Sequence, residues 1–307
     1  MTHVIILDGT MSSLQKGCET NAGLIYKLLA ELPVRANVSL RYEPGIQWRT
    51  WHSLRDVITG KGLNGQIQRA YGALASRYRR GDRIFMFGYS RGAYAVRSLA
   101  GVIDRVGLVR ADHATARTVA RAYRHYRDLT DATAFSAANC HEAATVEMIG
   151  VFDTVKALGL RAPLLWRDSD PAHEFHNHEL GQTTRNGFHA LALNETRRAY
   201  DPILWDSTPD FTGTLKQMWF RGTHGDIGGH QLCRAECRPL ANIPLTWMLE
   251  QAEECALALP NDWRARFQTD PEAPSIGNTE GWGKFILNRA PRIPGHDPSE
   301  AIHPTAR

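Results

Sequence analysis

The chain has 307 residues, of which 43% are hydrophobic and 22% are charged, and its formal net charge is only +4 at pH 7. This composition excludes disordered, collagen-like and coiled-coil proteins, and no apolar run approaches the roughly 18 residues of a membrane-spanning helix. Basic residues are interleaved with acidic ones, and no basic tail or nucleic-acid-reading motif is present, so we expect no nucleic-acid partner.

Two further features bear on cellular location. Residues 1–7 lack the basic region that opens a secretory signal. The five cysteines, an odd number scattered through a long chain, favour a reducing compartment over a disulfide framework. We therefore expect a cytoplasmic protein. Secretion by a route that needs no signal peptide is the open alternative.

Short apolar runs that stop at polar or small residues predict buried parallel strands. In chain order these runs cover residues 4–7, 38–42, 84–87, 146–152 and 217–220. Helical patterns cover residues 21–32, 63–80, 91–106, 114–129, 187–199 and 244–257. The alternation predicts an α/β fold in which helices cover both faces of a mostly parallel sheet. We expect residues 1–307 to form one α/β-hydrolase-like domain with a possible loop-rich lid over residues 160–187.

A G-x-S-x-G motif lies in residues 87–93, between a predicted strand and a predicted helix. A serine on such a tight turn projects its hydroxyl above the sheet, and Gly88 and Gly92 let strand and helix approach closely. The backbone amide of Arg91, at the helix start, would face a developing oxyanion. A Gly-rich turn with an inert serine is the alternative, but the strand-turn-helix context favours Ser90 as a nucleophile.

A serine nucleophile needs a histidine base that is oriented by a carboxylate. In α/β-hydrolases these partners follow in the order Ser, acid, His. Asp153 ends the strongest apolar strand after Ser90, and His224 follows the next clear strand in a glycine-dense loop. His230 and Asp226 are the rivals, and Asp226 is expected instead to hold the loop of His224. The sequence therefore favours Asp153 and His224 as the partners of Ser90.

The motif Asp8-Gly9-Thr10 closes the first predicted strand. A backbone amide of Gly9 or Thr10 is a candidate second oxyanion donor, and Asp8 would brace the loop. Phosphatases of the haloacid-dehalogenase type begin with D-x-D-G-T, and their first aspartate is the nucleophile. Ile6 stands at that position here, so a phosphoaspartate mechanism has no nucleophile.

A metal site is the remaining rival. His230, Cys233 and Cys237 have the spacing of three ligands, but the paired C-x-x-C pattern and a fourth ligand are absent from this stretch. We expect no metal and no cofactor.

With these motifs in view, the chain resembles the α/β-hydrolase family of type VI secretion phospholipase effectors, formerly a domain of unknown function. The segments that carry the resemblance are 7–10, 81–94, 97–101, 150–155, 189–195, 219–229 and 243–248. It implies that Ser90 is the nucleophile, Asp153 the orienting acid and His224 the base. The chain departs from the family at Asn194, where an aspartate is common, and at His230, which replaces a glycine.

The leading hypothesis is a serine hydrolase that cleaves carboxylic esters, and the resemblance implies lipid or phospholipid acyl esters. An acyltransferase or peptidase with the same triad is the alternative within enzyme chemistry, because the acceptor is not encoded in the turn of the nucleophile. A non-catalytic scaffold is the third possibility. The apolar residues 160 and 163–166 predict either peripheral membrane contact or ordinary packing.

Overall fold

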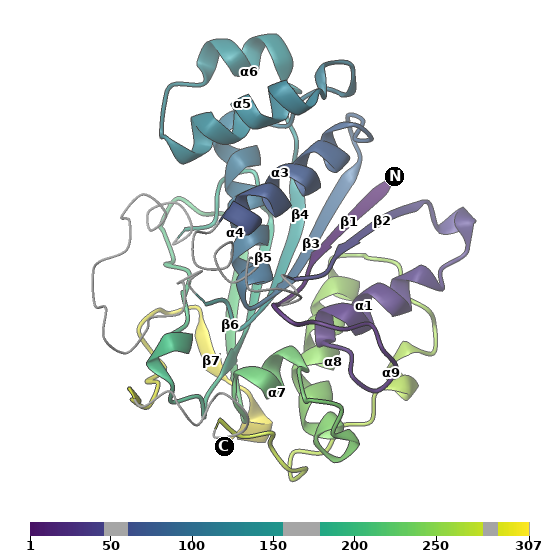
Figure 1. Cartoon of the computed structure of the whole chain (residues 1–307), viewed down its shortest axis with the longest axis vertical. Coiled ribbons are helices and arrows are strands. Elements are labelled where there is room, and N and C mark those ends of the chain that lie inside the picture. The colour runs from purple at the N-terminus through teal and green to yellow at the C-terminus, as the bar shows by residue number, and fades with distance from the viewer. Residues whose placement is uncertain (46–60, 156–178, 279–287, 307) are drawn as a thin grey trace.

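The computed structural model describes residues 1–45, 61–155, 179–278 and 288–306. These residues form a seven-stranded sheet in the order β2-β1-β3-β4-β5-β6-β7, and every neighbouring pair is parallel (Figure 1). The strands are β1 (Thr2–Leu7), β2 (Val38–Glu43), β3 (Arg83–Tyr89), β4 (Val146–Phe152), β5 (Asn186–Ala192), β6 (Thr214–Phe220) and β7 (Glu300–Ile302).

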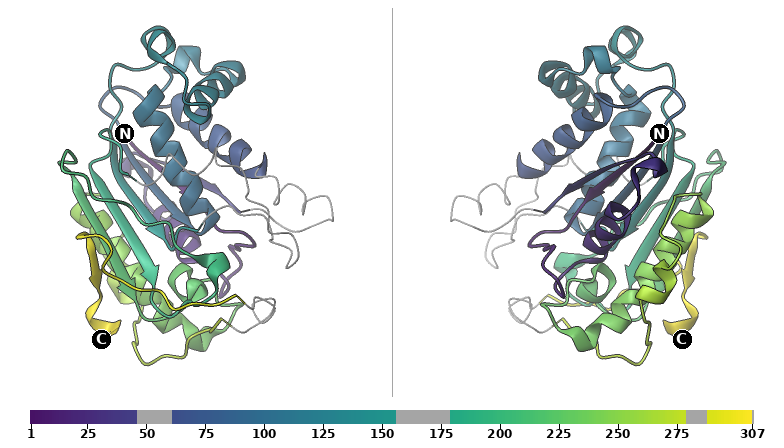
Figure 2. Two further views of the ribbon diagram at one scale, coloured as in Figure 1. Left: turned by 90° about the vertical axis from the view of Figure 1, so that its left-hand side faces the viewer. Right: turned by 90° about the vertical axis from the view of Figure 1, so that its right-hand side faces the viewer.

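Helices cover both faces of this sheet, as the side views in Figure 2 show. They are α1 (Asn21–Ala30), α3 (Lys61–Ala75), α4 (Arg91–Val106), α5 (Ala116–Arg127), α6 (Thr133–Asn139), α7 (His224–Gly228), α8 (Arg238–Glu254) and α9 (Trp263–Arg266). Among the residues that the structure describes, no helix is both long enough and apolar enough to cross a membrane.

The hydrophobic core consists of two clusters, one on each face of the sheet. Successive strand residues point to opposite faces, so Ile5 and Leu7 of β1 join the cluster beneath α3, α4 and α5. Val4 and Ile6 join the cluster beneath α1 and α8. Burial on both faces explains why the strands read as nearly continuous apolar runs in the sequence.

The strand order places the polar strand ends together. The chain runs from β1 to its neighbour β2 and then crosses to β3 on the other side of β1. Ligands of open α/β sheets bind at such a switch point, outside the carboxyl ends of the strands. Because the strands are parallel, the segments that follow β1, β3, β4, β5 and β6 all emerge at this same edge.

The predicted α/β class, the parallel sheet and the helices on both faces are confirmed. The five predicted strands and five of the six predicted helices are present; α4 and β4 have the predicted ends, and the other elements have shifted ends. The helix predicted over 187–199 is wrong, because residues 186–192 form β5. A short apolar run fits a buried strand as well as a helix, and both neighbours of β5 bury it here. The edge strand β7, only three residues long, gave no sequence signal.

The cysteine interpretation also needs correction. Cys18 and Cys233 form a disulfide across 215 residues of sequence. Spacing along the chain carries no information about such a distant pair. Bonded to Cys18, Cys233 supplies no thiolate to the metal site considered above. Cys140, Cys237 and Cys255 are free.

The predicted lid falls largely outside the described residues, because residues 160–178 are not among them. The end of that range differs from the prediction, since β5 already begins at Asn186.

Candidate active site

Ser90 occupies the turn between β3 and α4 in a strained backbone conformation, with φ 57° and ψ −121°. Its amide donates to the carbonyl of Phe152, 3.0 Å away, which ties the turn to the end of β4. A Cβ on Gly92 would lie 2.1 Å from the carbonyl oxygen of Leu7, and one on Gly88 would lie 2.6 Å from Ala93 Cα. Only glycine fits at either position, so the motif glycines are what allows the turn to pack here.

His224 joins Ser90 to Asp153 through both ring nitrogens. Nε2 lies 2.9 Å from Ser90 Oγ, and Nδ1 lies 2.6 Å from Asp153 Oδ2. All three residues are buried. With Nδ1 protonated and donating to the carboxylate, Nε2 presents a lone pair to the serine hydroxyl. The strand ends thus bring together the serine, acid and histidine that the sequence favours.

Asp153 accepts four hydrogen bonds, two at each carboxylate oxygen. Oδ1 accepts from the Ala192 amide at 3.1 Å and from Arg292 Nη1 at 2.6 Å. Oδ2 accepts from His224 and from Arg292 Nη2, which lies 3.0 Å away. Burial alone would raise the pKa of Asp153, but the charge of Arg292 and the His224 bond hold this pKa well below its usual range. Asp153 is therefore an ionised carboxylate in a fully buried position.

Two tyrosine rings flank the imidazole of His224. The centroid of its ring lies 5.0 Å from that of Tyr89 and 4.7 Å from that of Tyr200. Tyr89 also donates through its hydroxyl to the backbone carbonyl of His224, 3.2 Å away. This packing restricts the ring to the orientation that points Nε2 at Ser90.

Glu195, in the loop after β5, holds the backbone of the same histidine. Its fully buried carboxylate accepts the His224 amide at 3.2 Å. Arg197 binds both oxygens of Glu195, at 2.8 and 2.6 Å, and lies 4.2 Å from the ring centroid of Tyr200. Burial opposes ionisation, but Arg197 lowers the pKa of Glu195 below its usual value.

Asp226 caps the short helix α7 that begins at His224. Its carboxylate accepts the Thr223 amide at 2.7 Å and the Ile276 amide at 2.9 Å, and it also accepts the Ser275 hydroxyl. In the described structure no bond joins Asp226 to the imidazole of His224, so Asp226 holds the loop. His230, likewise, makes no hydrogen bond to Ser90 or Asp153 within the described residues.

Asp8 braces the loop after β1. Its Oδ1 accepts the Gly9 amide at 2.7 Å, and its Oδ2 accepts the hydroxyls of Thr20 and Tyr42 at 2.6 and 2.7 Å. Burial raises the pKa of Asp8 to about 6, although these hydrogen bonds oppose the shift. The Gly9 amide is therefore engaged, whereas the Thr10 amide has no hydrogen-bond acceptor in the described structure.

Sequence reasoning missed the residues that orient the predicted triad. Glu195 lay in a stretch that the periodicity assigned to a helix, so its position at a strand end was hidden. Tyr89 occupies the variable position of the G-x-S-x-G motif, which carries no chemical signal of its own. Arg292 is 139 residues from Asp153 in a Pro- and Gly-punctuated segment, and no local pattern marks it.

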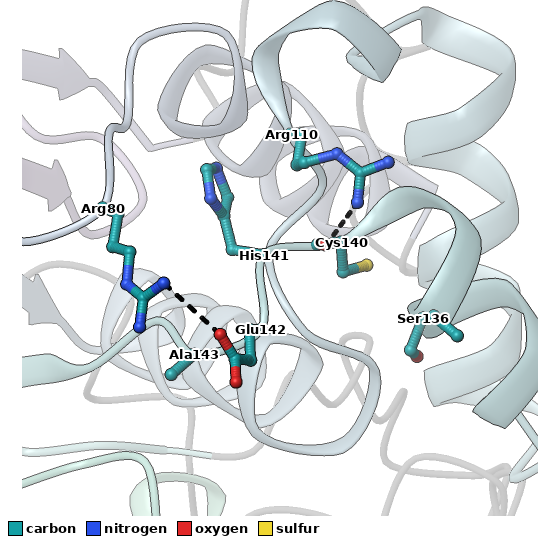
Figure 3. Close-up of a pocket in the computed structure, with 8 residues that line it drawn as sticks. Arg80, Arg110, Ser136, Cys140, His141, Glu142 and Ala143 are labelled. Atoms are coloured by element: carbon teal, nitrogen blue, oxygen red, sulfur yellow. Dashed lines mark hydrogen bonds and ion pairs between the residues drawn. The ribbon is translucent and has the colours of Figure 1, made fainter.

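A separate pocket of about 490 Å³ is lined by Arg80, which precedes β3, by His141 and Glu142, which precede β4, and by residues near α6 (Figure 3). Its charged groups are already paired: Arg80 contacts Glu142 at 3.4 Å, and Arg110 donates to the Cys140 carbonyl at 2.8 Å. Among the described residues, no cluster of three or more His, Cys, Asp or Glu side chains is arranged to hold a metal ion.

The parallel α/β sheet, with a serine on a strand-to-helix turn, defines an α/β-hydrolase-like protein. The sequence matches the family described as "T6SS, Phospholipase effector Tle1-like, catalytic domain" over residues 2–251. The chain belongs to this family. By this description, the family consists of catalytic domains of phospholipase effectors.

Three individual proteins are similar to parts of the chain. An uncharacterized protein from Saccharomyces cerevisiae is 32% identical over 121 residues, which are 34% of this chain and 18% of that protein. A crystal structure of an uncharacterized protein from Pseudomonas aeruginosa has a TM-score of 0.51 at 16% identity and covers 88% of this chain and 49% of its own. The structure of the Tle1 effector bound to the VgrG spike from the Type 6 secretion system has a TM-score of 0.34 at 17% identity, with coverage of 74% and 50%. The chain thus spans about half the length of these solved chains.

Proposed function

We propose that the chain is a serine esterase that hydrolyses acyl esters of lipids, phospholipids included, through Ser90, His224 and Asp153. The observation that carries the proposal is the unbroken hydrogen-bond path from Ser90 Oγ through the imidazole to the Asp153 carboxylate, with steps of 2.9 and 2.6 Å. Its arrangement matches the requirement of nucleophilic acyl transfer for a hydroxyl, a base and an orienting anion. Family membership supports a lipid as the ester.

In the first half of the reaction, Ser90 Oγ attacks the ester carbonyl carbon while His224 Nε2 takes the hydroxyl proton. The resulting imidazolium is stabilised by the ionised Asp153 on the far side of the ring. The tetrahedral intermediate collapses when the bond to the leaving alcohol breaks and His224 donates its proton to that alcohol. The acyl group remains on Ser90 as an ester.

In the second half, a water molecule takes the place of the alcohol. His224 removes a proton from the water, the hydroxide attacks the acyl carbon, and collapse of the second intermediate returns the proton to Ser90 Oγ. A fatty acid leaves. Each tetrahedral intermediate carries an oxyanion, which needs positioned donors.

The Arg91 amide, at the first turn of α4, is one proposed oxyanion donor. Thr10 is favoured over Gly9 as the second, because the Gly9 amide already donates to Asp8. β1 and β3 are neighbouring parallel strands, so the loops that follow them leave the sheet beside each other, which supports the Thr10 and Arg91 amides as a pair of donors. A proposed peripheral contact with the membrane through the apolar residues 160 and 163–166 lies outside the described residues.

The proposal is tested by comparing wild type with Ser90→Ala on short-chain p-nitrophenyl esters and on phosphatidylcholine and phosphatidylglycerol vesicles. We expect Ser90→Ala to lower ester and lipid hydrolysis by about 10⁴-fold or more, because the nucleophile is lost. Ser76→Ala is the matched control, since Ser76 is an exposed serine that lies after α3 and before the start of β3, whereas Ser90 follows the end of β3. Full activity in Ser90→Ala would contradict the mechanism.

Product analysis separates this function from its alternatives. Hydrolysis predicts free fatty acid and a lysolipid, even with an added alcohol present at moderate concentration. Preferential transfer of the acyl group to the alcohol would identify an acyltransferase, and cleavage of peptides without ester hydrolysis would identify a peptidase. A folded wild-type chain with no turnover on any of these substrates would favour a binding scaffold.

A further inference from the structure

Arg292 reaches the proposed active site from a segment outside the family match. The match ends at residue 251, whereas Arg292 lies in the described stretch 288–306, ahead of β7. Its guanidinium binds both oxygens of Asp153, at 2.6 and 3.0 Å. Such a two-pronged bond fixes a carboxylate in rotation as well as in position.

The segment that carries Arg292 is itself anchored to the sheet. The Arg198 amide donates to the Asn288 carbonyl at 3.0 Å, and the Ala290 amide donates to the Thr196 carbonyl at 2.8 Å. Further along, Glu300 accepts the indole Nε1 of Trp219 at 2.7 Å where β7 pairs with β6. These bonds hold the backbone on both sides of Arg292, so its side chain is positioned next to Asp153.

The two terminal nitrogens of the Arg292 guanidinium also donate to backbone carbonyls. Nη1 donates to the Ala192 carbonyl at 2.9 Å, and Nη2 donates to the carbonyl of Tyr200. The ring of Tyr200 packs against the imidazole. Arg292 therefore contacts both Asp153, which binds His224 Nδ1, and Tyr200, whose ring packs against the imidazole.

The ion pair is buried, with side-chain exposures of 4% for Arg292 and 0% for Asp153. Loss of one partner from a buried pair leaves an uncompensated charge, which is strongly unfavourable. Burial raises the pKa of Asp153, and the charge of Arg292 is the largest influence that lowers it. Loss of Arg292 would therefore raise this pKa. The carboxyl group would then take up a proton at a higher pH than in the wild type.

We propose that Arg292 is a positioning residue of the hydrolytic site: it holds the Asp153 carboxylate ionised and in one orientation, so that Oδ2 receives His224 Nδ1–H. This inference rests on the proposed function, because it acts through the acid of that triad. The matched family segment supplies the three reacting side chains, and the C-terminal segment supplies the charge that keeps the acid in its working state.

Several other ionisable groups share this environment, and they are the same in every variant compared below. Asp153 is influenced by Arg292 and His224, and Arg292 also faces the exposed Asp201. The groups that face Asp153 or His224 from the surrounding elements are Tyr89 of β3, His189 of β5, Glu195, Arg197 and Tyr200 of the following loop, and His230 after α7.

The test compares pH profiles of kcat/KM for a short-chain p-nitrophenyl ester in the full chain. Arg292→Gln is expected to lower kcat/KM at about pH 8 by roughly 10- to 100-fold, because Asp153 is no longer fixed. The acidic limb of its profile should also move to higher pH by about one unit, because Asp153 becomes protonated there. Arg185→Gln removes the same charge from an exposed position before β5 and should leave the profile unchanged.

Arg292→Lys is the second variant, and it guards against a folding defect in Arg292→Gln. Lysine keeps the charge but lacks the planar fork, so we expect a reduced kcat with an acidic limb close to the wild-type position. Thermal unfolding of each variant shows the fraction that is folded. A merely structural role would lower the amount of active protein without moving the limb.

A double-variant comparison locates the effect. In an Asp153→Asn background, Arg292→Gln should change kcat/KM by less than about threefold, because the partner through which it acts is already neutral. An unshifted limb in Arg292→Gln, or an equal loss in the Asp153→Asn background, would overturn the inference. Failure of the proposed function itself is seen separately, as turnover that survives in Ser90→Ala.

Discussion

Two buried carboxylates, at the ends of β1 and β4, differ sharply in their state. Asp8 is held by an amide and two hydroxyls, and burial raises its pKa to about 6. Asp153 is equally buried, yet Arg292 keeps its pKa well below the usual range. Within the described residues no ion pair involves Asp8. Burial alone therefore does not decide whether a carboxylate is charged, because a neighbouring cation can keep it ionised.

The difference in charge between the two carboxylates corresponds to a difference in role, structural for Asp8 and catalytic in the proposal for Asp153. Asp8 bonds the amide of its own loop and needs no charge to do so, whereas the role proposed for Asp153, which is to stabilise an imidazolium, requires an anion. The cation that makes this possible comes from the segment after residue 287 and not from the matched family region.

The largest expected effect follows from neutralising the carboxylate at the end of β4. Asp153→Asn should lower kcat/KM by about 10⁴-fold, because an amide there holds His224 in the wrong tautomer. Steady-state hydrolysis of a p-nitrophenyl ester measures it. Asp262→Asn, at an exposed position in an ion pair with Arg266, is the control and should retain full activity. An Asp153→Asn variant within tenfold of wild type would remove the distinction between the two carboxylates.

The next effect concerns the loop that Asp8 braces. The Cys18–Cys233 disulfide links this loop to the segment that follows α7. Cys18→Ser should lower the free energy of unfolding by up to about 5 kcal/mol, because the cross-link restricts a very long loop in the unfolded chain. Equilibrium denaturation with and without reductant measures the change.

Cys255→Ser is the control, since Cys255 is a free and only half-buried thiol, and it should stay within about 1 kcal/mol of wild type. Reductant should destabilise the wild type and leave Cys18→Ser unaffected. If the denaturation midpoint of the wild type did not change with reductant, the disulfide would not stabilise this loop.

The smallest effect is a pH dependence at Asp8. Its pKa is raised from 3.8 to about 6 on folding, so its contribution to stability is fully present below about pH 4 and is lost as pH rises through 6. Asp8→Asn mimics the protonated carboxyl and removes this dependence. The stability of Asp8→Asn relative to wild type should therefore increase by about 2 kcal/mol between about pH 4.5 and 7.5.

Denaturant unfolding of both proteins at the two pH values measures this difference, in which the other ionisable groups cancel. A constant difference would mean that Asp8 is charged at both pH values. The end of β1 would then resemble the end of β4.

The parts of the fold and site that sequence could predict are those encoded locally. Runs buried on both faces marked β1, β3 and β4, and the polar residues that end them pointed to Asp8, Ser90 and Asp153. The buried run of β5 has the same composition as a short helix, so the strand was misassigned and Glu195 went unnoticed. Residue identity near the chain's strand ends was informative because parallel strands bring those ends together.

Long-range partners could not be predicted. Arg292 meets Asp153 across 139 residues, and Cys18 meets Cys233 across 215. Both contacts depend on how the segments pack, and one sequence without its relatives contains no pattern for either. The environment of the acid, more than the identity of the reacting groups, is what the structure adds.

We propose Ser90 as the nucleophile that His224 activates. The most direct measurement is peptide mass spectrometry of the wild-type chain after reaction with a fluorophosphonate. We predict a single adduct on the peptide that contains Ser90, which is absent from Ser90→Ala and forms far more slowly in His224→Ala. An adduct on another residue with Ser90 unmodified, or equal labelling of His224→Ala, would contradict the account.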